Sequence, residues 1–373
     1  MKRVLVTGAG GAPALNFVRS LRLAPESFHI IGTDSNKYYL QRAETDERHL
    51  APRASDEAYV PYMRQLIEDT RVEFVFAQPD PEIAVLSAHR DEIGATTFLP
   101  SKETVTLLQD KFASNQRWAE AGIKIPATMM VNTPEDLAEA FDTLGAPVWL
   151  RPITGAAGRG ALAARDLAEA NTWMDFNKGW GYYSAAEYLS PRSVTWQSIW
   201  RNGELVVAQG RMRLYWEFGD RAPSGVTGLT GAGITVDDPQ VDDIAMRAVR
   251  AVDQRPDGIF AVDLTYDRDG VPNPTEINVG RFFTTHLFFT VAGINMPYVY
   301  VKLAYGEEPP HIPRRINPLS PGLVWIRGID KEPVLRTEQE IDASLLDMEQ
   351  RLARVRQTDE PKAALADNAH HLS

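Results

Sequence analysis

The stretch from Gly258 to Arg281 constrains the fold more than any other part of this sequence. Residues 258–266 alternate as a strand does, a turn signal follows at 267–270, and a second short strand begins after it. Residues two apart on a strand share a face, so Glu276 and Asn278 point the same way, and a hairpin partner can bring Asp263 beside them. Two carboxylates and an amide oxygen suit a hard cation, and Arg281 beside them suits a phosphate. The alternative is a surface hairpin with ordinary polar residues.

The N-terminal part of the chain alternates short apolar strands with helical segments. Strands are expected at residues 4–8, 30–34 and 74–77, and a helical pattern follows the first of them. This pattern predicts a parallel sheet in a doubly wound, Rossmann-like α/β domain. The loop Gly8-x-Gly10-x-x-Pro13 and Asp34 match a dinucleotide fingerprint in part, because Pro13 stands where a third small residue is usual. A tight strand-to-helix turn would need the same small residues.

The rest of the chain reads as a mixture of strands and helices. The expected elements are a helix at 103–122, strands at 147–150 and 183–189, an Asn-Gly hairpin at 194–208, a helix at 239–252, a strand at 322–327 and a polar helix at 338–355. The tail from 358 to 373 is expected to be flexible.

Length, charge and residue usage exclude several classes of protein. A chain of 373 residues is longer than one compact core usually needs, and it has no cysteine for disulfides, thiolate zinc sites or cysteine nucleophiles. The net charge of −11 argues against a nucleic-acid partner, and no apolar run has the length of a membrane span. Met1–Gly8 enters a strand without the apolar region of a signal peptide, so we expect a cytoplasmic enzyme. A homodimer is the default expectation.

A glycine-rich loop follows the strand at 147–150. It reads Arg151-Pro-x-x-Gly155-x-x-Gly158-Arg159-Gly160, and its glycines let backbone amides approach an anion while its arginines supply charge. No Gly-Lys-Ser/Thr follows, so it is not a P-loop. The loop could close as a lid over a reactive phosphate, or it could be only a mobile basic hairpin tip.

The order of these features resembles the ATP-grasp superfamily, especially its carbamoyl-phosphate-synthase-like and biotin-carboxylase-like branch. The series runs from a Rossmann-like domain through Asp110-Lys111, the strand into Arg151, the glycine-rich loop and the strand 186–189 to the Asp263, Glu276-Ile-Asn278 and Arg281 element. The resemblance covers residues 1–327, and the Glu-Ile-Asn element is its most specific part. It implies a Rossmann-like domain at 1–105, a small subdomain at 106–185, a large subdomain at 186–315 and a C-terminal strand, helix and flexible tail at 316–373.

The resemblance also implies roles for individual residues. Lys111, Arg151 and Arg159, with the loop Gly155, Gly158 and Gly160, would bind the phosphates of ATP. Glu187, Tyr188 and Leu189 would form the hinge beside the adenine. Asp263, Glu276 and Asn278 would bind one or two Mg²⁺ ions, with Mn²⁺ as an alternative occupant, and Arg281 would face the transferred phosphoryl group.

The sequence departs from the family pattern in two respects. Arg151 stands where the family usually has lysine, and a forked guanidinium places its charge differently from an ammonium group. No acid follows the hinge to hold the ribose, and Thr195 or Gln197 could substitute for it.

The substrate region is predicted from the segment 209–228. Arg211 and Arg213 share a strand face and could hold a substrate carboxylate, and Ser224–Gly228 could form an amide-lined anion nest. A solvated basic edge strand is the alternative. Aromatic residues that could line the acceptor pocket, or belong to the core, are Tyr215, Trp216, Phe282, Phe283 and His286. His286 is also a candidate general base.

Together these features predict an ATP-dependent carboxylate–amine ligase. It would activate a carboxylate, such as that of an amino acid, as an acyl phosphate and couple it to an amine acceptor, with release of ADP and phosphate. Two alternatives stay open: a Rossmann-type NAD(P)-dependent oxidoreductase or epimerase, and a nucleotide-binding protein of the same fold without catalytic turnover.

Overall fold

The chain forms two compact units, which are described separately. The computed structural model describes residues 1–156, 158–328 and 337–369. Unit 1 is built from Met1–Leu99, Pro297–Pro309 and the described C-terminal residues, and unit 2 from Pro100–Met296 and the segment that begins at Pro310. The predicted subdomain 106–185 falls within unit 2, and the predicted subdomain 186–315 does so except for Pro297–Pro309, which belongs to unit 1. The boundary between the two subdomains stays a prediction.

Unit 1 has a five-stranded parallel sheet, as the strand–helix alternation predicts. Its strands lie in the order β3-β2-β1-β4-β5. Their bounds are β1 (Lys2–Val6), β2 (Phe28–Asp34), β3 (Glu47–Leu50), β4 (Phe74–Phe76) and β5 (Thr96–Thr97). The helices are α1 (Ala12–Arg22), α2 (Lys37–Leu40), α3 (Tyr59–Thr70), α4 (Asp80–Ala88) and α11 (Met296–Ala304). β1 and β4 lie inside the sheet, and their apolar runs Val4–Val6 and Phe74–Phe76 are wholly buried, because both faces of the sheet are covered there.

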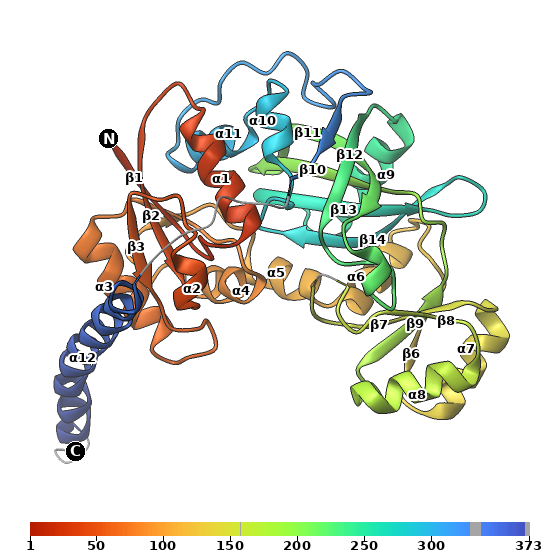
Figure 1. Cartoon of the computed structure of the whole chain (residues 1–373), viewed down its shortest axis with the longest axis horizontal. Helices are drawn as coiled ribbons and strands as arrows, with labels where there is room; N and C mark the ends of the chain where they lie inside the picture. The colour runs from red at the N-terminus through yellow and green to blue at the C-terminus, as the bar shows by residue number, and fades with distance from the viewer. Residues whose placement is uncertain (157, 329–336, 370–373) are drawn as a thin grey trace. The chain divides into compact units, whose positions relative to one another are not determined.

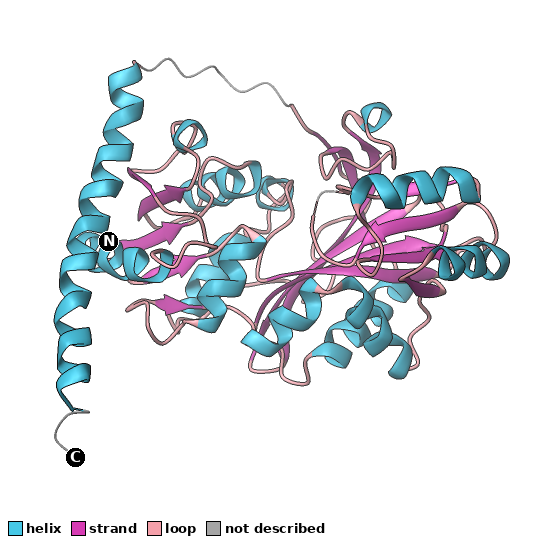
Figure 2. Ribbon diagram, turned by 90° about the horizontal axis from the view of Figure 1, so that it is seen from below, coloured by secondary structure: helices cyan, strands magenta, loops and turns pink. Residues whose placement is uncertain are grey.

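The long C-terminal helix α12 (Glu338–Ala369) packs against β3, α2 and α3 of unit 1 (Figures 1 and 2). Arg351 is 5% exposed and pairs with Asp69 on α3, and Asp342 pairs with Lys37 on α2 at 2.8 Å. The helix continues through Ala369, beyond the predicted end at residue 355 and into the segment that was expected to be a flexible tail. Residues 370–373 of that segment lie outside the described residues.

Unit 2 contains a small antiparallel sheet in the order β6-β9-β7-β8. Its elements are β6 (Thr128–Val131), β7 (Val148–Pro152), β8 (Leu162–Ala164) and β9 (Tyr183–Glu187), with helices α7 (Pro134–Leu144) and α8 (Leu167–Asn177). Apolar side chains of the strands and of both helices form one core, which includes Leu137, Val148, Leu150 and Met174. The predicted strands at 147–150 and 183–189 are therefore confirmed as β7 and β9, with the ends shifted by one or two residues.

The larger sheet of unit 2 is antiparallel apart from one isolated bridge and has the order β14-β13-β10-β11-β12-β15 (Figure 1). Its strands are β10 (Ser193–Arg201), β11 (Glu204–Trp216), β12 (Thr230–Val236), β13 (Gly258–Tyr266), β14 (Pro272–Val279) and β15 (Val324–Ile326). Helices α5 (Lys102–Gln109), α6 (Lys111–Glu120) and α9 (Pro239–Val252) pack on this sheet, and α10 (Leu287–Val291) follows β14. The predicted Asn-Gly turn is confirmed, with both Asn202 and Gly203 at positive φ.

The single helix expected at 103–122 is wrong, because the chain breaks at Asp110. Asp110 is in an extended conformation, and its carboxylate accepts hydrogen bonds from the backbone N–H groups of Phe112 and Ala113, which caps α6. Lys111 thereby becomes the first residue of α6, and its own N–H donates to the carbonyl of Ile153 at 2.8 Å. The break brings Lys111 beside the glycine-rich loop.

Candidate active site

Almost all of the predicted site residues line a cavity of about 530 Å³ in unit 2. Its wall is formed by β7, β9 and the glycine-rich loop on one side and by β10–β14 on the other. The predicted residues that line it are Lys111, Arg151, Gly155, Gly158, Arg159, Glu187, Tyr188, Leu189, Arg211, Arg213, Asp263, Glu276, Asn278 and Arg281. Gly160 is the exception: it does not line the cavity, and its carbonyl accepts a hydrogen bond from Trp173 Nε1 at 2.9 Å. The size of the cavity and its mainly apolar lining, with a few charged side chains, suit a small-molecule site.

The β13–β14 hairpin brings the three predicted metal ligands together. Asp263 and Glu276 are direct partners in the ladder, and Asn278 Nδ2 donates to Asp263 Oδ2 at 2.9 Å. The ladder has an irregularity just after Asp263. On the other side of β13, Thr195 of β10 donates to Asp263 Oδ1 at 2.5 Å. The hairpin is therefore not a plain surface turn, since its polar face lines the cavity.

These residues fit a magnesium ion as a partial set of ligands. Among the described residues, no group of three or more His, Cys, Asp or Glu side chains could hold a metal. Asp263 and Glu276 supply two carboxylates and Asn278 an amide oxygen, all hard oxygen donors. Mg²⁺ is usually held by one or two carboxylates together with phosphate oxygens and water, so such a set suits Mg²⁺ bound along with a nucleotide.

Lys111 and Arg151 place two cations next to this hairpin. Lys111 Nζ donates to the carbonyl of Gly155 at 2.5 Å and lies 3.8 Å from Glu276 Oε1. Arg151 Nη2 donates to the carbonyl of Thr275 at 3.1 Å, so this arginine is tied to β14. Burial lowers the pKa of Arg151, and attraction to Glu276 opposes that shift. Arg151 thus faces the same acidic edge as Lys111.

The glycine-rich loop needs its glycines for conformation and for close approach. Gly155, Gly158 and Gly160 have φ values of 111°, 66° and 75°, which side chains rarely adopt. A Cβ atom on Gly158 would lie 2.7 Å from the carbonyl oxygen of Val226. The loop therefore packs closely against the segment 224–228, and both line the cavity.

The predicted hinge lies at the end of β9. Glu187 is the last residue of that strand, and Tyr188 and Leu189 follow it along the cavity wall. The ring of Tyr188 is tilted against that of Trp149 on β7, with 6.2 Å between the centroids. Trp149 also lines the cavity, and the sequence analysis did not single it out.

Arg211 and Arg213 lie on β11 and both line the cavity, so the solvated basic edge strand is excluded for this pair. Arg211 is 2% exposed, donates to Thr230 Oγ1 at 3.0 Å and to Thr195 Oγ1 at 2.8 Å, and lies over the ring of Phe283. Gly233 of β12 makes room for it, since a Cβ atom there would meet Arg211 Cδ at 2.4 Å.

Arg213 donates to Thr230 Oγ1 at 3.2 Å and to Ser193 Oγ at 2.7 Å, and its Nη2 lies 3.9 Å from Asp263 Oδ1. Its guanidinium stacks over Trp216. Arg281 lies on the other side of the acidic hairpin and donates through Nη2 to Asn278 Oδ1 at 2.5 Å. Arg213 and Arg281 thus flank Asp263 and Asn278.

Several predicted residues have other roles in the structure. Gln197 is wholly buried and its Oε1 accepts from the backbone N–H of Phe283 at 3.1 Å, so it does not line the cavity, whereas Thr195 does. Of the aromatic candidates, Trp216 and Phe283 line the cavity. Tyr215, Phe282 and His286 do not: Tyr215 is 48% exposed, and Phe282 and His286 are wholly buried. His286 Nδ1 lies 2.8 Å from the carbonyl of Phe283, so the general-base hypothesis is not supported.

Sequence reasoning missed the hydroxyl residues that surround the arginines. Thr230 and Ser193 both hold arginine side chains, and Thr195 links Arg211 to Asp263. Threonine and serine are ordinary residues in strands, so nothing in their local sequence marks them. Only the strand register of β10, β11 and β12 reveals these contacts.

The N-terminal glycine loop of unit 1 is filled by its own chain. A Cβ atom on Gly10 would lie 1.9 Å from the carbonyl oxygen of Tyr39, and one on Gly8 would lie 2.6 Å from the ring of Pro79. Asp34 Oδ2 accepts from the N–H of Gly10 at 3.2 Å rather than facing an open groove. The close packing explains the small residues of this loop and fits the alternative of a tight strand-to-helix turn.

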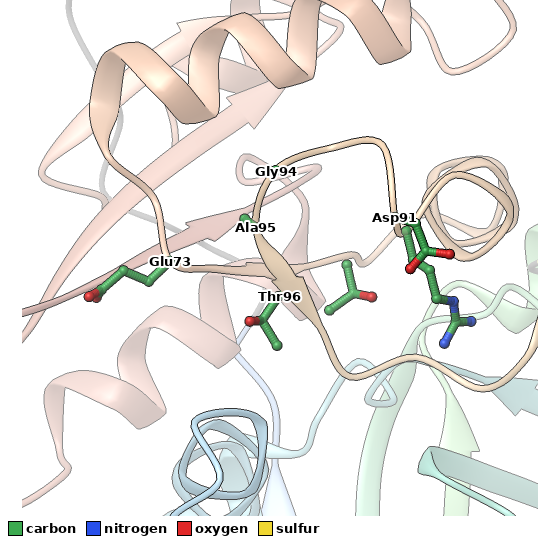
Figure 3. Close-up of a pocket in the computed structure, with 7 residues that line it drawn as sticks. Glu73, Asp91, Gly94, Ala95 and Thr96 are labelled. Atoms are coloured by element: carbon green, nitrogen blue, oxygen red, sulfur yellow. The ribbon is translucent and has the colours of Figure 1, made fainter.

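A second hollow lies at β5 of unit 1 (Figure 3) and offers little chemistry. It is lined by Glu73, Arg90, Asp91, Gly94, Ala95, Thr96 and Thr97. Glu73 accepts from the backbone N–H of Arg3 at 3.0 Å, and Arg90 donates to the carbonyl of Leu99 at 3.2 Å. These side chains serve local structure, and the cavity of unit 2 is the stronger candidate. No helix among the described residues has the length and apolarity to cross a membrane.

Comparison with solved structures identifies the fold. A biotin carboxylase from Campylobacter jejuni, solved as a β,γ-ATP complex, matches with a TM-score of 0.64 and 17% identity over 83% of this chain and 72% of that chain. Carboxyaminoimidazole ribonucleotide synthase from Aspergillus clavatus, solved with ATP, matches with a TM-score of 0.63 and 16% identity over 83% and 78%. An L-amino acid ligase from Bacillus licheniformis matches with a TM-score of 0.61 and 14% identity over 82% and 74%. No protein-family model matches the sequence.

These proteins are ATP-grasp enzymes, and the chain has their fold. The fold expected from the ordered series of residues is therefore confirmed.

Proposed function

We propose that this protein is an ATP-dependent carboxylate–amine ligase that uses the cavity of unit 2. The observation that carries the proposal is the meeting of two groups of residues in one cavity. The acidic hairpin of Asp263, Glu276 and Asn278 faces the cations Lys111 and Arg151 and the glycine-rich loop. Such a set suits the positioning and charge neutralisation on which phosphoryl transfer depends.

ATP would lie between the small sheet and the large sheet. The adenine would lie along Tyr188 and Leu189, with Trp149 as an aromatic wall, and the phosphates would lie under the loop 155–160. Lys111, Arg151 and Arg159 would offset the negative charge of the phosphates. Mg²⁺, or Mn²⁺ in its place, would be held by Asp263, Glu276 and Asn278 and would neutralise charge on the transferred phosphoryl group. The comparison enzymes solved with ATP or with a magnesium salt of ADP support this choice of cofactors.

The reaction would proceed in two steps. A carboxylate oxygen of the acid attacks the γ-phosphorus, and the bond from that phosphorus to the bridging oxygen breaks, so that ADP leaves. An amine nitrogen then attacks the acyl carbon, the carbon–oxygen bond to phosphate breaks, and an amide and phosphate result while the amine loses a proton to solvent. Arg281 and Arg213 flank the acidic hairpin and would hold the acid and its developing charge.

The range of the comparison enzymes supports the reaction class but does not name the substrates. An L-amino acid ligase and a phosphoribosylglycinamide synthetase share the fold with this chain. We therefore propose a small-molecule carboxylate and an amine acceptor, in a soluble protein without a nucleic-acid partner. A homodimer is proposed because a related carboxylase domain is a dimer.

The proposal is tested by ADP release in the presence of ATP, Mg²⁺ and panels of acids and amines. Glu276→Gln keeps the shape of the side chain but removes its charge, and should lower substrate-dependent ADP release at least a hundredfold, or about 3 kcal/mol of transition-state stabilisation. Glu169→Gln is a matched control, because Glu169 lies on α8 and does not line the cavity. Full ADP release by Glu276→Gln would show that the hairpin is not the phosphoryl-transfer site.

A further inference from the structure

Arg211 and Arg213 carry two charges in a part of the cavity that is poor in acids. Arg211 is wholly enclosed, and it contacts the hydroxyl groups of Thr195 and Thr230 and the ring of Phe283. Arg213 shares the hydroxyl of Thr230 with it. A buried guanidinium needs an acid or several strong acceptors to offset the loss of water, and two hydroxyl groups do this only in part.

The described residues give Arg211 no carboxylate partner within ion-pair distance. Its Nε is buried and has no hydrogen-bond partner among them. Burial, and then repulsion by Arg213, lower the pKa of Arg211, while Asp263 opposes the shift from a distance. The acid nearest to Arg213 is Asp263, at 3.9 Å, and that carboxylate belongs to the proposed metal site. The arginine pair therefore suits an anionic group of a ligand, which would supply the charge that the neighbouring side chains do not.

The acids of the cavity cannot serve a substrate ammonium group. Glu187, Asp263 and Glu276 are the acidic side chains among the described lining residues, against six cationic ones. Asp263 and Glu276 face each other at the proposed metal site. Glu187 lies at the hinge, where its negative charge helps to raise the pKa of Lys124. An ammonium group beside Arg211 and Arg213 would thus meet like charges without a carboxylate to balance them.

We infer that the acid substrate is a dianion without an ammonium group, whose second anionic group binds to Arg211 and Arg213. This inference rests on the proposed function, because the other anionic group is the carboxylate that is phosphorylated beside Arg281. The second group is a carboxylate or a phosphate, since both accept forked hydrogen bonds from guanidinium groups. Thr230 and Ser193 hold the two arginines in place for it.

The inference is tested with matched acids that differ by one group. Succinate and aspartate differ in the ammonium group, as do glutarate and glutamate, whereas propionate lacks the second carboxylate. Glycerate 3-phosphate replaces that carboxylate by a phosphate. Each is titrated into the full-length protein saturated with Mg²⁺ and a non-hydrolysable ATP analogue, and tryptophan fluorescence reports binding, since Trp149 and Trp216 line the cavity.

We expect at least one of succinate, glutarate and glycerate 3-phosphate to bind at least tenfold more tightly than propionate and than both amino acids. The tighter of the carboxylate and phosphate probes identifies the second group. Equal or tighter binding of the amino acids overturns the inference, as does the absence of any preference over propionate. Failure of the ATP analogue itself to bind would instead refute the proposed function, so the two failures are distinguishable.

Two variants test whether the dianion binds to Arg211 and Arg213. Arg211→Met and Arg213→Met should each weaken binding of the preferred dianion at least tenfold and leave binding of the ATP analogue within threefold. Arg165→Met makes the same substitution at a side chain that is 83% exposed and does not line the cavity. It should change neither the affinity for the dianion nor the affinity for the ATP analogue. Unchanged dianion binding by both cavity variants would overturn the assignment, and two variants guard against one that does not fold.

Discussion

Replacing Arg211 by methionine should stabilise the protein without ligand while it weakens binding of the acid. Methionine has a similar length, and the change removes a charge that is 2% exposed and has only hydroxyl partners and an aromatic ring. No donor loses its acceptor, because Thr195 still donates to Asp263 and Thr230 still accepts from Arg213.

The size of the effect follows from the charge. Burial lowers the pKa of Arg211 to about 9, more than three pH units below its ordinary value. At about 1.4 kcal/mol per pH unit, this corresponds to a penalty of about 5 kcal/mol for the charged form, which is an upper bound. Replacement of buried ionic groups by apolar ones of similar volume gains about 1–4 kcal/mol in other proteins. We therefore expect the free energy of unfolding to rise by about 2 kcal/mol.

Equilibrium unfolding in urea, followed by tryptophan fluorescence, measures the change in the free energy of unfolding of unit 2. All eight tryptophans lie between residues 118 and 325, within unit 2, so the signal reports on the unit that contains Arg211. Arg165→Met should stay within about 0.5 kcal/mol of the unaltered protein. A loss of more than about 1 kcal/mol in Arg211→Met would refute the reasoning, because it would mean that the charge is already compensated and serves the fold.

Four further substitutions test other parts of the structure. Burial raises the pKa of Glu82 in unit 1 to about 7; the folded protein therefore holds a proton that the unfolded chain has lost, and stability should fall as pH rises from about 4.5 to about 7. Glu82→Gln should remove this pH dependence and raise the free energy of unfolding by about 3 kcal/mol at pH 8, measured by circular dichroism. A free energy of unfolding that varies with pH in the variant as it does in the unaltered protein would contradict the account. Gly158→Ala should raise the Kd of the Mg²⁺–ATP analogue at least tenfold, because its Cβ would lie 2.7 Å from Val226 O at a φ of 66°; unchanged affinity would mean that the two loops need not approach each other. Thr195→Val removes the donor to Asp263 and the acceptor for Arg211, and should raise the Mg²⁺ concentration needed for half-maximal ADP release about tenfold, or about 1.4 kcal/mol. Thr230→Val touches only the arginines and should affect the acid alone; equal effects of both on the Mg²⁺ requirement would refute this division of roles.

The sequence was most informative where the period of the strands decides which residues meet. Asp263, Glu276 and Asn278 were predicted to share a face from alternation and a turn signal alone, and the hairpin register confirms it. The parallel sheet of unit 1 was likewise predictable, because buried parallel strands are continuous apolar runs.

Other features depend on contacts between segments that are distant in the chain. The break at Asp110 was missed because the helical pattern continues across it, and only the cap reveals it. Gln197 and His286 seemed suited to the site, but strand register and local packing turn both into the core. The hydroxyl groups around Arg211 belong to β10 and β12, and no local sequence pattern predicts these hydrogen bonds.

Formation of an acyl phosphate is the central claim, and hydroxylamine tests it without knowledge of the amine. Hydroxylamine attacks the acyl carbon of an acyl phosphate and gives a stable hydroxamate. The protein is incubated with ATP, Mg²⁺, hydroxylamine and an acid preferred in the binding assay, and ADP and hydroxamate are quantified together. The account predicts equal amounts of the two products, both lost in Glu276→Gln. ADP formed without hydroxamate, or hydroxamate formed as well by Glu276→Gln, would contradict it.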